Sequence, residues 1–349
     1  MRFTIAILVI FAAIPCAADL LIDRPVPQTD PLEFGSLRID DADLCSGVEP
    51  GWQATVTSTY FNQWNQSWHL RQTRDDRDAP RMPVTIAEID DVESVWAPND
   101  DIYVLDVEGT KTELQLARAF AGGYAITLRV PWITIGGMSG DVIGETAHHV
   151  LPQRRDRDLF ARGATLVYLK MKGKLRVLHS ADLERAGAGD TTVTMSAPIG
   201  MRHRVGVAVQ APTGRAGTLH GSGGWDTAAL WQSRWETPRW AATASAGFSI
   251  LDGAGDLLGI DRENLWYVTG SYTRSLSSST SARVVARLES SPLASFTSAN
   301  VGAPSLMYTI GVMHSFGAFR IAADLGEELL PQSGVDSDYS LHVSVGRRF

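Results

Sequence analysis

Apolar and polar residues alternate with a period of two over most of the C-terminal half of the chain, a pattern typical of β-strands. In "RWAATASAGFSI", Trp240, Phe248 and Ile250 share one face and small polar residues take the other. The stretches "SARVVARLES", "SLMYTIGVMHSF" and "FRIAADLGEEL" alternate in the same way. Each predicted strand has about ten residues, which is enough to cross a hydrocarbon core when the strand is tilted. Strands of soluble proteins average nearer five or six residues.

Earlier segments continue the series with turn signals between them. "WQATVTSTYFNQW" reads as a strand, and "DIYVLDVEG" and "KTELQLARAF" read as two strands on either side of Gly109. "GYAITLRVPW" follows Gly122 and Gly123, and "ATLVYLKMKGKLRVLHS" reads as a hairpin about Gly173. Consecutive strands joined by glycine-containing turns predict an antiparallel meander. "SWHLRQTRDDRDAPRMP" has no period and is expected to be a loop.

The segment 136–163 interrupts this rhythm, and we expect a long loop there with a short helix around residues 142–150. The end of the chain, "DSDYSLHVSVGRRF", is a further strand. One of its faces carries Tyr339, Leu341, Val343, Val345 and Phe349. Arg347 falls on the same face, which near a membrane interface costs only about 0–1 kcal/mol.

An apolar outer face and a small or charged inner face, on long regular strands, predict a closed antiparallel transmembrane β-barrel of 12–14 strands. Closure is required because hydrocarbon offers backbone groups no hydrogen-bond partner. The side chains expected on the inner face are Arg129, Arg283, Arg287, Glu289, Arg320, Asp324 and Glu328. They either set the field of a channel or pair with one another to fill the interior.

The N-terminus indicates where the protein is sent. Arg2, an apolar run from Phe3 to Ile14 and small residues up to Ala18 form the pattern of a secretory signal peptide, so we expect cleavage of residues 1–18. Residues 19–50 are expected to form a periplasmic arm or a plain leader, with a plug as the alternative, and residues 51–349 the barrel. Cleavage would leave Cys45 without a disulfide partner.

The amino-acid composition limits the classes of molecule that this protein is expected to bind. The chain has 349 residues with 31 Lys and Arg against 39 Asp and Glu, a formal net charge of −8, so no nucleic-acid partner is expected. Ten tryptophans suit the aromatic girdles of a membrane barrel. The expected surroundings are outer-membrane lipids and lipopolysaccharide, whose phosphates arginine-rich loops can bind. A small solute is the expected passenger, and no cofactor or metal is expected.

The segment from Leu105 to Leu159 resembles an uncharacterised bacterial outer-membrane, barrel-like family catalogued as domain of unknown function 3187. "GSGGWDTA" further along resembles it too. The motif residues are Asp106, Glu108, Pro131, Gly136, Gly137, Asp141, Ile143, Glu145, His148 or His149, and Arg157 with Asp158 and Leu159. The resemblance implies an outer-membrane barrel and no known reaction. The last strand is also similar to the C-termini of exported barrels, where the final aromatic residue is recognised by the barrel-assembly machinery.

Three roles stay open at this point. The first is a pore or transport protein for a small solute in the outer membrane. The second is a structural barrel with a plugged lumen. The third is an outer-membrane enzyme, because Asp141, Glu145 and His149 are spaced by four residues and would share a helix face. We nevertheless expect that the protein is not an enzyme. A soluble periplasmic β-sandwich is the alternative fold, because alternation fits it as well.

Overall fold

The computed structural model describes residues 36–44, 50–67, 70, 85–96, 102–136, 165–171, 174–179, 186–252, 262–293, 302–328 and 337–349. The expected signal peptide, the expected helix around 142–150 and the motif positions Asp141, Glu145, His148, His149 and Arg157 lie outside these residues. None of the helices in the described part of the chain has the length and apolar character needed to cross a membrane.

Fifteen strands form one antiparallel sheet in the described residues. Twelve of them, β1, β2, β3 and β7 to β15, close into a barrel when β15 pairs with β1. Their bounds are β1 Gly51–Gln66, β2 Ile102–Ala119, β3 Ala125–Ile135, β7 Thr191–Ile199, β8 His203–Ala211, β9 Asp226–Thr237, β10 Trp240–Ile250, β11 Leu265–Ser275, β12 Thr280–Glu289, β13 Ser305–Phe316, β14 Phe319–Glu328 and β15 Ser337–Arg348. The predicted barrel and its lower strand number are confirmed.

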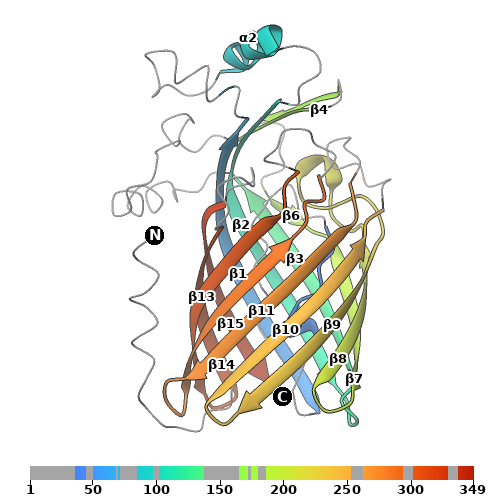
Figure 1. The fold of residues 1–349 in the computed structure, drawn as a ribbon, viewed down its shortest axis with the longest axis vertical. Coiled ribbons are helices and arrows are strands. Elements are labelled where there is room, and N and C mark those ends of the chain that lie inside the picture. Colours follow the sequence, from blue (N-terminus) through green and yellow to red (C-terminus); the bar gives the residue numbers. More distant parts are fainter. Residues whose placement is uncertain are drawn as a thin grey trace.

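The two ends of the barrel differ, as Figure 1 shows. At the turn end, consecutive strands are joined by short turns, as between Phe316 and Phe319, and both Gly51 and Phe349 lie there. Gly122 and Gly123 form the predicted turn between β2 and β3 with φ of +89° and +83°, angles that favour glycine. At the loop end the connections are long. Short turns at one end and longer loops at the other are the pattern of bacterial outer-membrane barrels.

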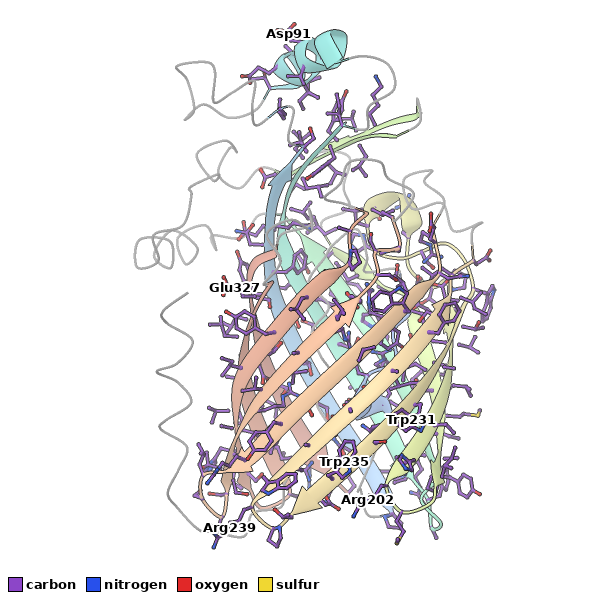
Figure 2. All side chains as sticks on the ribbon, in the orientation of Figure 1. Asp91, Arg202, Trp231, Trp235, Arg239 and Glu327 are labelled. Carbon is purple, nitrogen blue, oxygen red and sulfur yellow. The ribbon has the colours of Figure 1, made fainter. Side chains whose placement is uncertain are left out.

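Outward-facing positions are apolar along the barrel, because every second residue of each strand points away from the interior. In β15, Leu341, Val343, Val345 and Arg347 are exposed, while the residues between them are buried or half-buried. Exposed aromatic residues near the turn end are Trp52, Phe120, Tyr124, Trp235, Tyr272, Phe316, Phe319 and Phe349. Figure 2 shows side chains projecting from the wall, with the labelled Arg202, Trp235 and Arg239 all towards the turn end. The Arg347 guanidinium lies over the rings of Phe319 and Phe349, 4.9 and 4.8 Å from their centroids.

Gly109 is not a turn, contrary to expectation. It lies inside one continuous strand, β2, and its pair across the sheet is Phe61. A Cβ at Gly109 would overlap the Thr134 carbonyl oxygen and the Phe61 ring, so the glycine serves the close approach of a neighbouring strand and of a buried aromatic side chain. The two predicted strands are therefore one of 18 residues, long enough to continue beyond the barrel.

Above the loop end, β2 exchanges its partner β3 for β4 (Leu166–Met171), which forms the predicted hairpin with β5 (Lys174–His179). Helix α2 (Ile86–Trp96) lies over this extension in Figure 1. We call α2, the upper part of β2, β4 and β5 the cap. Its buried core is formed by Leu70, Ile89, Val92, Ile102, Val104 and Tyr168. The remaining strand, β6 (Ala186–Ala188), pairs with the end of β3.

The described part of the N-terminal segment is a plug. Residues 36–44 are all buried and end in the 3-10 helix η2 (Asp41–Leu44). They contact the inner face of the barrel from β2 to β12. The reason is that Arg38, Asp40, Asp41 and Asp43 find ionic or hydrogen-bonding partners inside. We use "the plug" for residues 36–44.

Candidate functional site: the plugged lumen

The plug crosses the lumen from the loop end towards the turn end. Its first residues reach the loop-end half of the wall, where Ser249 donates a hydrogen bond to the Leu37 carbonyl at 2.6 Å. Its last residues reach the turn-end half, where Thr127 and Ser196 donate to the Asp43 and Leu44 carbonyls, each at 2.9 Å. Wall side chains thus bind the plug's main chain along its length, as they would bind an extended ligand.

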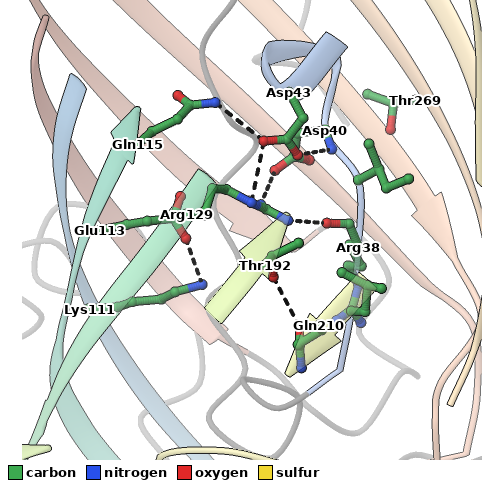
Figure 3. A network of polar contacts seen from close by, with 12 residues as sticks. Arg38, Asp40, Asp43, Lys111, Glu113, Gln115, Arg129, Thr192, Gln210 and Thr269 are labelled. Carbon is green, nitrogen blue, oxygen red and sulfur yellow. Dashed lines mark hydrogen bonds and ion pairs between the residues drawn. The ribbon is translucent and has the colours of Figure 1, made fainter. Parts of the chain in front are cut away.

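Arg129, on β3, is the centre of the polar network in Figure 3. Its guanidinium lies 3.3 Å from an Asp43 carboxylate oxygen and 3.5 Å from one of Asp40, and it donates to the Arg38 carbonyl at 2.5 Å. Gln115, on β2, donates to the same Asp43 carboxylate at 3.3 Å. One wall cation therefore holds two plug carboxylates and one plug carbonyl.

A second wall cation, Arg287 on β12, pairs with the other side of Asp40. Arg38 of the plug makes the reverse contact: its guanidinium forms two hydrogen bonds to the Glu289 carboxylate, at 2.7 and 3.1 Å. Such bidentate pairs are among the strongest hydrogen-bonded contacts in proteins. The plug is thus fixed by charge on opposite sides, to β3 and to β12.

Burial in the lumen disfavours the charged form of the plug carboxylates. Burial raises the pKa of Asp43 to about 7, although the Arg129 guanidinium opposes this rise. Burial also raises the pKa of Asp41, against the hydrogen bond that Thr243 donates to it at 2.6 Å. The charged plug therefore depends on its wall partners, because an unpaired buried charge is strongly unfavourable.

Apolar packing of the plug is limited in extent. Leu37, Ile39 and Leu44 form a small buried cluster with Tyr267 and three wall residues of β8 and β9. The Tyr267 hydroxyl accepts a hydrogen bond from the Ile39 amide at 3.0 Å. Gly206 makes room for Leu44, since a Cβ at this position would overlap the leucine side chain.

The opposite wall, β13 to β15 and β1, carries ion pairs and hydrogen bonds between its own strands and their neighbours. Arg283 on β12 reaches across β13 to Asp324 on β14 at 3.3 Å, and Gly311 lies between the two positions. A side chain at Gly311 would occupy the space of the Asp324 carboxylate. His342 lies 2.8 Å from both the Thr59 and the Ser340 hydroxyl. Nearby on β2, Lys111 pairs with Glu113 at 3.6 Å.

The residues expected on the inner face fall into groups. Arg129, Arg287 and Glu289 meet at the plug, and Arg283 pairs with Asp324 away from it. Arg320 is half-buried near the turn end, and the side chains of Glu328 and Tyr339 lie outside the description. The motif residues Asp141, Glu145, His148, His149 and Arg157 are likewise outside it. Among the described residues no cluster of His, Cys, Asp and Glu is arranged to hold a metal ion.

Sequence reasoning did not identify the residues of two polar centres. One is the plug, considered only as an alternative, whose signal is "SLRIDDADL": apolar Leu37 and Ile39 alternate with Arg38 and Asp40 before the first barrel strand. The other lies at the loop end, where Arg262 forms a fully buried two-bonded pair with Asp226, at 3.0 and 2.9 Å. Asp226 lies in the family-like stretch "GSGGWDTA", but nothing near it in the sequence indicated Arg262 as its partner.

One solved structure supports the fold, and two further ones are more distantly similar. The COG4313 outer membrane channel from Pseudomonas putida F1 is similar with a TM-score of 0.53 and 11% identity, covering 89% of this chain and 100% of that one. The P. putida toluene transporter TodX gives a TM-score of 0.42 at 9% identity, covering 87% and 92% of the two chains. A KdgM porin in complex with oligogalacturonate gives 0.40 at 9%, covering 71% and 98%.

No curated protein matches the chain. A sequence family does, over residues 48–349, which is most of the chain and the whole of the barrel. That family is the one which the residues between Leu105 and Leu159 resemble. The chain belongs to the family described as protein of unknown function, DUF3187.

Proposed function

We propose that this protein is a bacterial outer-membrane channel for a small solute and that its own N-terminal segment closes the lumen. The observation that carries the proposal is the way the plug is held. Its main contacts are ion pairs and hydrogen bonds to a hydrophilic wall. Water can replace such contacts, whereas it cannot replace a large apolar core. A plug of this kind can leave without unfolding the barrel.

The exterior supports a membrane location. Exposed apolar residues follow the outward positions of the barrel strands, with aromatic residues near the turn end, as in outer-membrane barrels. In this placement the turn end faces the periplasm and the cap faces outward. The similar fold of a protein described as an outer membrane channel agrees with this proposal. Export by the signal peptide 1–18, recognition of Phe349 by the barrel-assembly machinery and contact with lipopolysaccharide belong to the same proposal.

Conductance in a planar lipid bilayer tests the channel. The wild type is compared with D40N/D43N, which removes the two plug carboxylates that Arg129 binds. D90N/D91N is the matched control, because it makes the same charge change on exposed residues of α2 in the cap. We expect rare openings in the wild type and the control and frequent openings in D40N/D43N.

A shift in gel mobility between unheated and boiled samples shows first that each variant is a folded barrel. Folded D40N/D43N that conducts no better than the wild type would refute the removable plug. If neither conducts, the structural barrel with a closed lumen is the better reading. The enzymatic alternative rests on Glu145 and His149, and an activity that survives E145Q and H149A would end it.

A further inference from the structure

The acidic side chains of the plug indicate which kind of ligand the wall around them can bind. Three carboxylates, those of Asp40, Asp41 and Asp43, enter the lumen within four residues. Each meets a wall donor: Arg287 and Arg129 for Asp40, Thr243 for Asp41, and Arg129 with Gln115 for Asp43. From this geometry we infer that the plug-covered wall is a binding site for a small dicarboxylate solute, which competes with the plug and opens the channel. This inference rests on the proposed channel function and names its solute class.

The charges of the wall favour an anion once the plug has left. Lys111 and Glu113 neutralise each other as a wall pair. What remains at the site are two guanidinium groups, Arg129 and Arg287, and one carboxylate, Glu289, which Arg38 no longer neutralises. Two cations against one anion leave a local excess of positive charge. Buried guanidinium groups need an anionic or strongly polar partner, so an entering carboxylate takes the place of the departing aspartate.

The arrangement suits two carboxylates rather than one. Arg129 contacts two different plug carboxylates, and Asp40 is shared between Arg129 and Arg287. Guanidinium groups bind carboxylates through paired, planar hydrogen bonds. A short carbon chain that carries a carboxylate at each end reproduces the Asp40 and Asp43 contacts, and Gln115 and Thr127 supply neutral donors beside them.

The test uses succinate as the probe and its uncharged diamide, succinamide, as the matched control, at constant ionic strength. Two properties of the full-length protein are measured. One is conductance in a planar bilayer. The other is cleavage by trypsin after Arg38 in detergent, detected as a new N-terminus at Ile39, because a bound plug shields this bond and a released plug exposes it.

Succinate is expected to raise both the opening frequency and the cleavage rate of the wild type by about tenfold or more, and succinamide is expected to change neither. In R129Q/R287Q the plug is expected to be loose from the start, so succinate adds nothing, and the preference for chloride over potassium falls. The control R239Q, which removes a cation at an exposed turn, should behave as the wild type.

The cleavage assay does not depend on ion conduction, so the dicarboxylate site and the channel function can be refuted separately. Equal effects of succinate and succinamide, or an undiminished succinate effect in R129Q/R287Q, would overturn the dicarboxylate site and leave the channel in place. Silence of both the wild type and D40N/D43N in the bilayer would overturn the channel. If R129Q/R287Q does not assemble, D40N alone, which leaves the wall intact, should need less succinate than the wild type for the same cleavage.

Discussion

Charged side chains in two parts of the inner wall are neutralised by different partners. On β3 and on β12, Arg129, Arg287 and Glu289 take their partners from the plug. Between β12 and β14, Arg283 takes its partner Asp324 from the barrel itself. Both arrangements join a guanidinium to a carboxylate in a buried setting. The difference is that one partner belongs to the plug, which we propose can leave, and the other belongs to a barrel strand.

In this arrangement the ion pairs that stabilise the barrel are separate from those that hold the plug in the lumen. Pairs between wall strands contribute to the barrel and remain when the plug departs. Pairs with the plug contribute to closure, since the barrel's backbone ladder does not pass through residues 36–44. Equivalent substitutions on the two sides should therefore affect different measurements.

E289Q should have the largest effect on closure. It removes the charge that Arg38 binds through two hydrogen bonds, and charge-assisted bonds of this kind contribute about 1.5–3 kcal/mol. We expect the open fraction to rise about tenfold or more, measured by conductance and by trypsin cleavage after Arg38. The unfolding midpoint of the barrel in denaturant should remain near that of the wild type. A closed, protease-resistant E289Q would show that Arg38 does not fix the plug.

D324N is the matching change on the opposite wall. It leaves Arg283 buried beside a neutral amide, so we expect the barrel to lose about 1.5–3 kcal/mol of unfolding free energy, the contribution of a charge-assisted hydrogen bond. Conductance and cleavage after Arg38 should stay at wild-type values. Should D324N instead open the channel, the two walls are coupled and the comparison fails.

G206A tests the apolar part of closure. The added methyl group overlaps Leu44, and overpacking of this kind typically costs about 1–3 kcal/mol. The plug should loosen, with a smaller rise in cleavage after Arg38 than in E289Q. G270A is the control, because a Cβ at this outward position meets no atom within 4 Å. Equal cleavage of the two variants would mean that Leu44 does not anchor the plug.

R347L should have the smallest effect. Arg347 lies on the outer face near the membrane interface, where an arginine costs about 0–1 kcal/mol, and its contacts with the Phe319 and Phe349 rings offset part of this cost. Barrel stability in detergent–lipid mixtures should change by less than about 1 kcal/mol. A large loss of stability would assign Arg347 a structural role that its position does not indicate.

The barrel was predictable because its signal is local and repeated. Period-two alternation in β10, β12, β13, β14 and β15 gives the faces directly. Gly109 misled the reading, since glycine marks both turns and sites of close packing, and only the paired Phe61 distinguishes them. Helix α2 was also missed, although its start carries a capping box in which Thr85 and Glu88 bond each other's backbone amides.

The site was predictable in part. Alternation along β3 and β12 indicated Arg129, Arg287 and Glu289 as inner-face candidates, and the structure brings these three together. It did not indicate what they bind. Arg38 and Glu289 are 251 residues apart in the sequence, and no periodic pattern connects them. Contacts of this kind depend on closure of the whole barrel.

The short tether of the plug has a consequence for the concentration at which the channel responds. Residues 45–50 join Leu44 to the first barrel strand, so the plug competes for Arg129 and Arg287 as a permanently attached ligand. A short linker keeps such a ligand at an effective concentration on the order of millimolar. A free solute of equal intrinsic affinity must reach a similar level to displace it. Tether length therefore sets a response threshold, and lengthening residues 45–50 would lower it without altering the binding site.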